Sequence, residues 1–137
     1  MLDHVELYVS NLKRTRQFYD VLLPKLGYHI FQEWEQGFSY RKGNFYLVFV
    51  QVNEKFLDIG YHRCYAGLNH LAFRLNSFKQ LDSLREELIL KDVHLLYDEN
   101  YPFAGGKDHY ALYFEDPDRI KIEIVAVEEG EYEEKTL

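Results

Sequence analysis

Hydrophobic and polar positions alternate along the chain in a pattern that occurs twice. In residues 3–9 the apolar side chains fall on one face of a predicted strand, and His4, Glu6 and Tyr8 fall on the other. Residues 69–75 alternate in the same way. Each run therefore predicts a strand with one face buried and one polar face.

The segment after each run has helical periodicity. The first helix should follow Ser10-Asn11 and end near Pro24, and the second should begin at the capping-box pattern Ser77-Phe-Lys-Gln80. Further alternating or apolar runs, separated by Gly, Asn, Asp and Pro, predict three more strands after each helix. These strands are expected near 27–35, 37–42 and 45–52, and again near 93–97, 109–115 and 119–126.

The repeat extends to the residues themselves. Leu2-Asp3-His4-Val5 returns 66 residues later as Leu68-Asn69-His70-Leu71. We therefore predict an α+β fold, in which two repeated βαβββ modules form a cup-shaped mixed sheet. A chain of 137 residues is too short for two independent cores. One domain is expected over 1–127, with module one at about 1–60 and module two at about 61–127.

Charge and cysteine content narrow the function. The net charge of −7 is concentrated in a predicted acidic tail, 128–137, and no cluster of Lys and Arg predicts nucleic-acid binding. Cys64 is the single cysteine, so no intrachain disulfide can form. No run is apolar enough to predict a membrane span or a secretory signal, so we expect a cytoplasmic protein.

Three side chains are candidate metal ligands. Glu123 alternates against Ile122 and Ile124, so it should stand on the polar face of its strand, as His4 and His70 do. Imidazole and carboxylate suit a divalent metal ion (Zn, Ni, Mn or Fe), and three protein ligands leave coordination positions open for water or substrate. This pattern favours a catalytic over a structural metal.

These segments resemble the vicinal oxygen chelate superfamily, which includes glyoxalase I, extradiol dioxygenases, fosfomycin-resistance enzymes and bleomycin-binding proteins. The resemblance is carried by His4-Val-Glu-Leu-Tyr-Val-Ser-Asn11, Asn69-His70-Leu-Ala-Phe and Asp116-Pro-Asp-Arg-Ile-Lys-Ile-Glu123. It covers the chain to about residue 127, and implies paired βαβββ modules, ligands at the positions of His4, His70 and Glu123, and a homodimer.

One departure from glyoxalase I concerns a fourth ligand. That enzyme uses a second Glu on the fourth strand, which also transfers the proton, whereas the corresponding segment here, 45–52, has no carboxylate. We expect Gln51 to face inward as a possible fourth ligand, and Phe49 to lie opposite Glu123. Without that carboxylate, efficient glyoxalase I activity is not expected.

Other polar residues are candidates for the chemistry. Glu6 and His109 are catalytic candidates, and Arg63, Tyr101 and Tyr110 are candidates for binding substrate. His62 also flanks a predicted loop at the edge of the cup, and the Gly-containing stretch 102–106 could close over it as a lid.

The resemblance leaves three functions open. The first is a lyase or isomerase of the glyoxalase type, in which a divalent metal binds vicinal oxygens of a small-molecule substrate. The second is an Fe(II) dioxygenase, because two His and one carboxylate form a facial triad. The third is a metal-free protein that sequesters an aromatic antibiotic in a groove of Tyr and Phe.

Overall fold

The structure is a computed structural model that describes residues 1–128. It has the predicted α+β composition, with two four-stranded mixed sheets and two helices. The first module contains β1 (His4–Val9), α1 (Leu12–Lys25), β2 (His29–Trp34), β3 (Gly37–Lys42) and β4 (Phe45–Gln51). The second contains β5 (Leu71–Leu75), α2 (Phe78–Leu90), β6 (Leu95–Leu96), β7 (Ala111–Glu115) and β8 (Lys121–Ala126).

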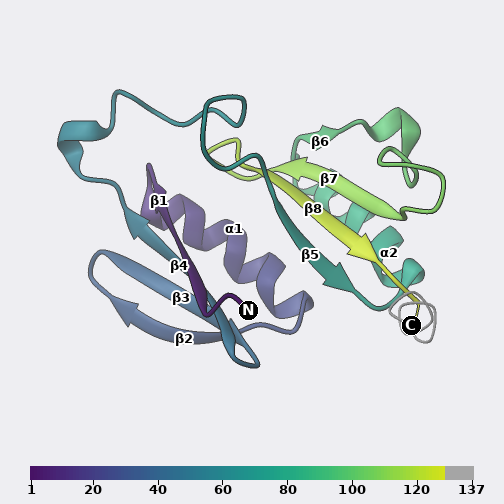
Figure 1. Ribbon diagram of the computed structural model, residues 1–137, viewed down its shortest axis with the longest axis horizontal. Helices are drawn as coiled ribbons and strands as arrows, with labels where there is room; N and C mark the ends of the chain where they lie inside the picture. Colours follow the sequence, from purple (N-terminus) through teal and green to yellow (C-terminus); the bar gives the residue numbers. More distant parts are fainter. Residues whose placement is uncertain (129–137) are drawn as a thin grey trace. The chain divides into compact units, whose positions relative to one another are not determined.

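Both modules have the same topology. The strand orders are β1-β4-β3-β2 and β5-β8-β7-β6, and in each sheet the first and last strands of the module run parallel while the other pairs are antiparallel. Figure 1 shows each helix lying along one face of its own sheet. The predicted repeat of two βαβββ modules is therefore confirmed.

Each helix buries its apolar stripe against its own sheet. In the first module Tyr19 of α1 packs on Phe49 of β4, with ring centroids 4.3 Å apart, and both side chains are fully buried. In the second module α2 contacts β5, β7 and β8, and buries Leu81, Leu84 and Leu88. Burial of each such leucine contributes about 2 kcal/mol. The core of each module thus lies between its helix and its sheet, and the opposite face of each sheet carries the polar side chains that are candidates for a functional site.

The two helix N-termini are capped in parallel ways. Ser77 Oγ accepts a hydrogen bond from the Gln80 amide at 3.1 Å, as the capping-box pattern predicts. In addition, the first amide of each helix donates to a side chain near the end of the last strand of its module. Leu12 N donates to Oε1 of Gln51, the last residue of β4, at 2.8 Å, and Phe78 N donates to Oε1 of Glu128, two residues after β8, at 3.0 Å.

Glu128 corrects one prediction. The sequence assigns it to a solvated acidic tail, but it is tied to the first turn of α2, where a negative charge also interacts favourably with the helix dipole. The rest of the predicted tail, 129–137, lies outside the described residues.

Strand β6 is shorter than predicted: it spans two residues where 93–97 was expected. Tyr97 has a φ of 56°, in the left-handed region, and a short 3-10 helix at Asp98–Asn100 follows. A left-handed residue turns the chain out of the extended conformation, so pairing with β7 stops at Leu96.

The chain divides into two compact units, one up to Tyr61 and one from His62 onward, which we call the first and second units. The predicted module boundary near residue 60 lies at this division. In the described part of the chain, no helix has both the length and the hydrophobicity needed to cross a membrane.

Candidate functional site

Each repeated histidine is held by the residue before it. In the first unit His4 Nδ1 lies 2.7 Å from Asp3 Oδ2, and in the second unit His70 Nδ1 lies 2.6 Å from Asn69 Oδ1. A carboxylate can only accept here, so the Nδ1 of His4 carries a proton and, in the neutral ring, its Nε2 keeps a lone pair. This is the orientation that second-shell partners give to metal-ligating histidines.

Glu123 lies on the face of the second sheet that α2 does not cover. It pairs with Ala72 of β5 and Tyr113 of β7, and its side chain is buried. His70, two residues before Ala72, places its Nε2 3.0 Å from Glu123 Oε1. The structure therefore brings together two of the three predicted ligands, both of which belong to the second unit.

The other oxygen of Glu123 has two partners of its own. His109 Nε2 bonds Glu123 Oε2, and the Tyr113 hydroxyl donates to the same oxygen at 3.2 Å. Burial, followed by the charge of Glu123, raises the pKa of Tyr113 to about 12. The hydroxyl therefore keeps its proton at neutral pH and acts as a donor to the carboxylate.

The His70–Glu123 pair fits part of a metal site. Two ligand atoms that bind one cation at about 2.1 Å and at a right angle lie about 3.0 Å apart. The separation of His70 Nε2 and Glu123 Oε1, 3.0 Å, is compatible with such a pair, and it is equally the length of an ordinary N–H···O hydrogen bond. Within residues 1–128 no group of three or more His, Cys, Asp or Glu side chains is assembled for a metal. A complete site thus needs a further ligand, and His4 in that role stays a prediction.

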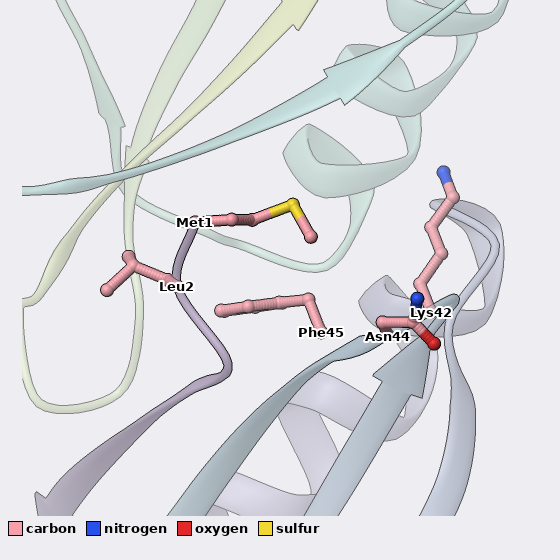
Figure 2. Close-up of a pocket in the computed structure, with 5 residues that line it drawn as sticks. All are labelled: Met1, Leu2, Lys42, Asn44 and Phe45. Carbon is pink, nitrogen blue, oxygen red and sulfur yellow. The ribbon is translucent and has the colours of Figure 1, made fainter.

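In the first unit His4 is the first residue of β1 and stacks on the Tyr46 ring of β4, with centroids 4.6 Å apart and an interplanar angle of 11°. Beyond this end of the sheet lies a hollow of about 440 Å³, lined by the residues labelled in Figure 2: Met1, Leu2, Lys42, Asn44 and Phe45. A second hollow, of about 660 Å³, lies at the opposite end of β1 and is lined in part by Tyr8, Val50 and Leu57.

Gln51 does not face the same side as His4, which corrects the prediction for a possible fourth ligand. The register pairs His4 with Tyr46, so β4 residues at even positions share the face of His4 and Gln51 lies on the face toward α1. Its Oε1 accepts from Leu12 N at 2.8 Å, and its Nε2 donates to Ser10 O at 2.9 Å. Its polar atoms are therefore used to cap α1.

The register also identifies the true counterpart of Glu123. Glu123 pairs with Ala72, and the residue 66 positions before Ala72 is Glu6, which pairs with Val48. Val48, not Phe49, therefore occupies the equivalent position, and Phe49 lies in the core against Phe38. The absence of a carboxylate at this position holds as the sequence indicates, but the residue that replaces it is valine.

Glu6, the other catalytic candidate beside His109, lies on the same face of β1 as His4. Its Oε1 is 3.9 Å from His4 Nε2, and 59% of its side chain is exposed. His109 differs from Glu6 because it contacts a predicted ligand, Glu123. The catalytic roles of both residues stay predictions.

Arg63 binds a residue of the protein itself. Its Nη1 lies 2.6 Å from Oε2 of the buried Glu115, which also accepts from Arg119. Burial opposes the ionisation of Glu115, but the hydrogen bonds from the two arginines outweigh it and lower the pKa of this carboxyl. The arrangement attaches the segment around Arg63 to the end of β7.

Tyr101 and Tyr110 point to α2. Both hydroxyls donate to Asp82 Oδ1, at 2.6 Å and 2.7 Å, and the Tyr110 ring stacks on Phe78 with centroids 4.2 Å apart. Burial and the bond to Asp82 raise the pKa of Tyr101. These contacts hold the segments before and after the predicted lid 102–106 against α2. His109, which also follows this stretch, is bonded to Glu123 instead.

Sequence reasoning missed three residues of this site. Tyr113 lies beside Glu123 only through the register of β7 with β8, which the sequence did not supply. Asp3 and Asn69 had a usable signal, since an oxygen-bearing side chain precedes the histidine in each copy of the repeat.

The chain is similar in sequence and in fold to known proteins. Residues 1–124 match the model of the Glyoxalase/Bleomycin resistance protein/Dioxygenase superfamily. The uncharacterized protein YqjT of Bacillus subtilis is 51% identical over 125 residues, which cover 91% of this chain and 98% of that protein. A candidate glyoxalase from Bacillus halodurans has a crystal structure with a TM-score of 0.90 and 48% identity, over 92% of this chain and 95% of that one. The fosfomycin resistance protein FosX from Listeria monocytogenes shares the fold, with a TM-score of 0.69 and 21% identity over 96% of each chain.

Proposed function

Because the chain belongs to the Glyoxalase/Bleomycin resistance protein/Dioxygenase superfamily, we propose that it is a metal-dependent enzyme of the glyoxalase type. It acts as a lyase or isomerase on a small substrate with vicinal oxygens. The ligand set is His4, His70 and Glu123. The observation that carries the proposal is the 3.0 Å approach of His70 Nε2 to Glu123 Oε1 on the sheet face opposite the helix.

The proposed roles follow from the contacts of these residues. A bound divalent metal ion would supply Lewis-acid polarisation of a substrate oxygen. Asp3 and Asn69 orient the two imidazoles by accepting from Nδ1, so that Nε2 is directed away from them. The Glu123 side chain is held in place, since it is buried and its Oε2 is bonded by His109 Nε2 and by the Tyr113 hydroxyl.

Proton transfer requires a group other than a carboxylate on β4. Val48 occupies the counterpart position of Glu123, and valine cannot accept a proton. We propose Glu6 for this role, because it lies on the face of His4 and its side chain is largely exposed; His109 is instead bonded to Glu123 through its Nε2. Activity with the glyoxalase I substrate, the methylglyoxal–glutathione hemithioacetal, is therefore expected to be low.

A second candidate function is sequestration of a small molecule without metal. The hollow of about 660 Å³ at the end of β1 supports it, because its volume is in the range of small-molecule sites and its lining combines apolar side chains such as Tyr8 and Leu57 with polar ones such as Asn53. An Fe(II) dioxygenase is the alternative that shares the metal ligands, and the identity of the bound metal separates it from the lyase.

Metal analysis of protein purified without chelator tests the proposal. We expect one divalent metal ion per site, lost in His4→Ala, His70→Ala and Glu123→Gln. The matched control is His29→Ala, which removes an exposed strand histidine at the start of β2. A metal-free wild type that binds aromatic molecules would favour sequestration and contradict the enzyme proposal.

The chain is also proposed to work as a homodimer with a small-molecule substrate. Light scattering of the purified protein should give twice the mass of one chain. A monomer at micromolar concentration would contradict this part of the proposal without affecting the metal site.

A further inference from the structure

The two oxygens of the Glu123 carboxylate have different environments. Oε1 lies 3.0 Å from His70 Nε2, on the side of the predicted metal. Oε2 is bonded by His109 Nε2 and by the Tyr113 hydroxyl. Both His109 and Tyr113 are bonded to Glu123, the ligand they would influence, so we treat both as acting on the site through this carboxylate.

We propose that His109 and Tyr113 are positioning residues that lock Oε2 of Glu123 and present Oε1 alone, beside His70 Nε2, to a divalent cation. The inference rests on the proposed function. A carboxylate whose one oxygen is held by two partners cannot turn both oxygens toward a cation without breaking those bonds. Glu123 is thereby restricted to one coordination position, and another stays open for the substrate.

The surroundings of the two residues support a rigid clamp. The Tyr113 ring lies edge-on to the Tyr97 ring at 5.5 Å, and the Lys121 ammonium lies 5.5 Å from its centroid. Gly105 packs against both members: a Cβ there would lie 2.5 Å from the Tyr113 hydroxyl oxygen and 2.8 Å from His109 Cδ2. Only glycine lets the loop backbone approach so closely, and this approach limits the movement of both side chains.

The test measures metal binding rather than turnover. Dissociation constants for Zn²⁺ and Co²⁺ would be determined by competition with a chromophoric chelator, together with the visible absorption spectrum of the bound Co²⁺. Tyr113→Phe removes the hydroxyl that donates to Glu123 Oε2, and His109→Ala removes the imidazole that bonds the same oxygen. Each should weaken binding about 10- to 100-fold, the usual effect of losing an outer-shell partner, and should alter the Co²⁺ spectrum.

Three further variants make the result specific. Tyr65→Phe is the matched control, because Tyr65 is an exposed tyrosine of the same unit and the variant should bind metal as the wild type does. His109→Gln keeps an N–H donor at a similar reach and should recover most of the affinity. Gly105→Ala keeps every partner but introduces the close Cβ contacts, so it should weaken binding without removing a hydrogen-bonding group.

The outcomes separate this inference from the proposed function. If the wild type binds Co²⁺ and both Tyr113→Phe and His109→Ala retain its affinity and spectrum, the clamp is wrong and the proposed function stands. If the wild type binds neither metal, the proposed function fails and the clamp fails with it. Melting temperatures of the metal-free proteins identify any variant that has lost its fold, and Tyr113→Phe, the smallest change, then decides.

Discussion

Replacing Gln51 should destabilise the fold rather than change the chemistry. In Gln51→Ala the first amide of α1, on Leu12, loses its acceptor at 2.8 Å, and the Ser10 carbonyl loses its donor at 2.9 Å. Loss of a helix N-terminal partner costs about 1 kcal/mol, and loss of a second part-buried hydrogen bond costs about 1 kcal/mol more. For a domain of this size about 2 kcal/mol lowers the melting temperature by about 8 °C.

Thermal unfolding followed by circular dichroism measures this change. Gln36→Ala is the matched control, because it truncates an exposed glutamine of the same unit. If Gln51→Ala melted at the same temperature as Gln36→Ala, the hydrogen bonds to Leu12 and Ser10 would contribute nothing, and the capping argument would be refuted.

Gln51→Glu extends the same reasoning to activity. The carboxylate can still accept from Leu12 N, but it cannot donate to the Ser10 carbonyl, so stability should fall by about 1 kcal/mol. Because residue 51 faces α1 and not the side of His4, metal-loaded Gln51→Glu should turn over the methylglyoxal–glutathione hemithioacetal no faster than the wild type. Faster turnover would show that the side chain reaches the site after all.

Three other changes test separate parts of the structure. Glu128→Ala should cost about 1 kcal/mol in urea unfolding, whereas Glu128→Gln, which keeps an oxygen acceptor for Phe78 N, should cost less; equal effects would exclude the cap. Thr15→Val should raise the melting temperature and add up to about 1 kcal/mol to the free energy of unfolding, because Thr15 Oγ1 is buried without a hydrogen-bond partner within the described residues. A lower melting temperature would mean that the hydroxyl does form a hydrogen bond. Burial and the hydrogen bond to Asp20 raise the pKa of Tyr40 to about 12. Between about pH 10 and 12 only the unfolded state ionises at this residue, so the free energy of unfolding should fall there by up to about 1.4 kcal/mol per pH unit. In Tyr40→Phe this fall should be less steep.

The sequence by itself determined the modular fold. Alternation at 3–9 and 69–75, helical stripes after each run and the repeated Leu-Asx-His motif are local signals, and burying one apolar face per element leaves few ways to arrange them. The structure confirms the βαβββ modules and the buried helix-facing residues such as Tyr19 and Leu81. It also places His70 and Glu123 on one face, as their strand parity predicts.

What only the tertiary structure decided is the pairing between strands. A shift of one residue in register moves every side chain of a strand to the other face, and turn residues alone did not fix the pairing of β4. This is why Gln51 was expected beside the metal but caps α1, and why Val48 is the counterpart of Glu123. The partners of Glu123 Oε2 were likewise decided by tertiary structure, because Tyr113 reaches the carboxylate through the pairing of β7 with β8 and His109 reaches it from the segment before β7, and no local pattern encodes either contact.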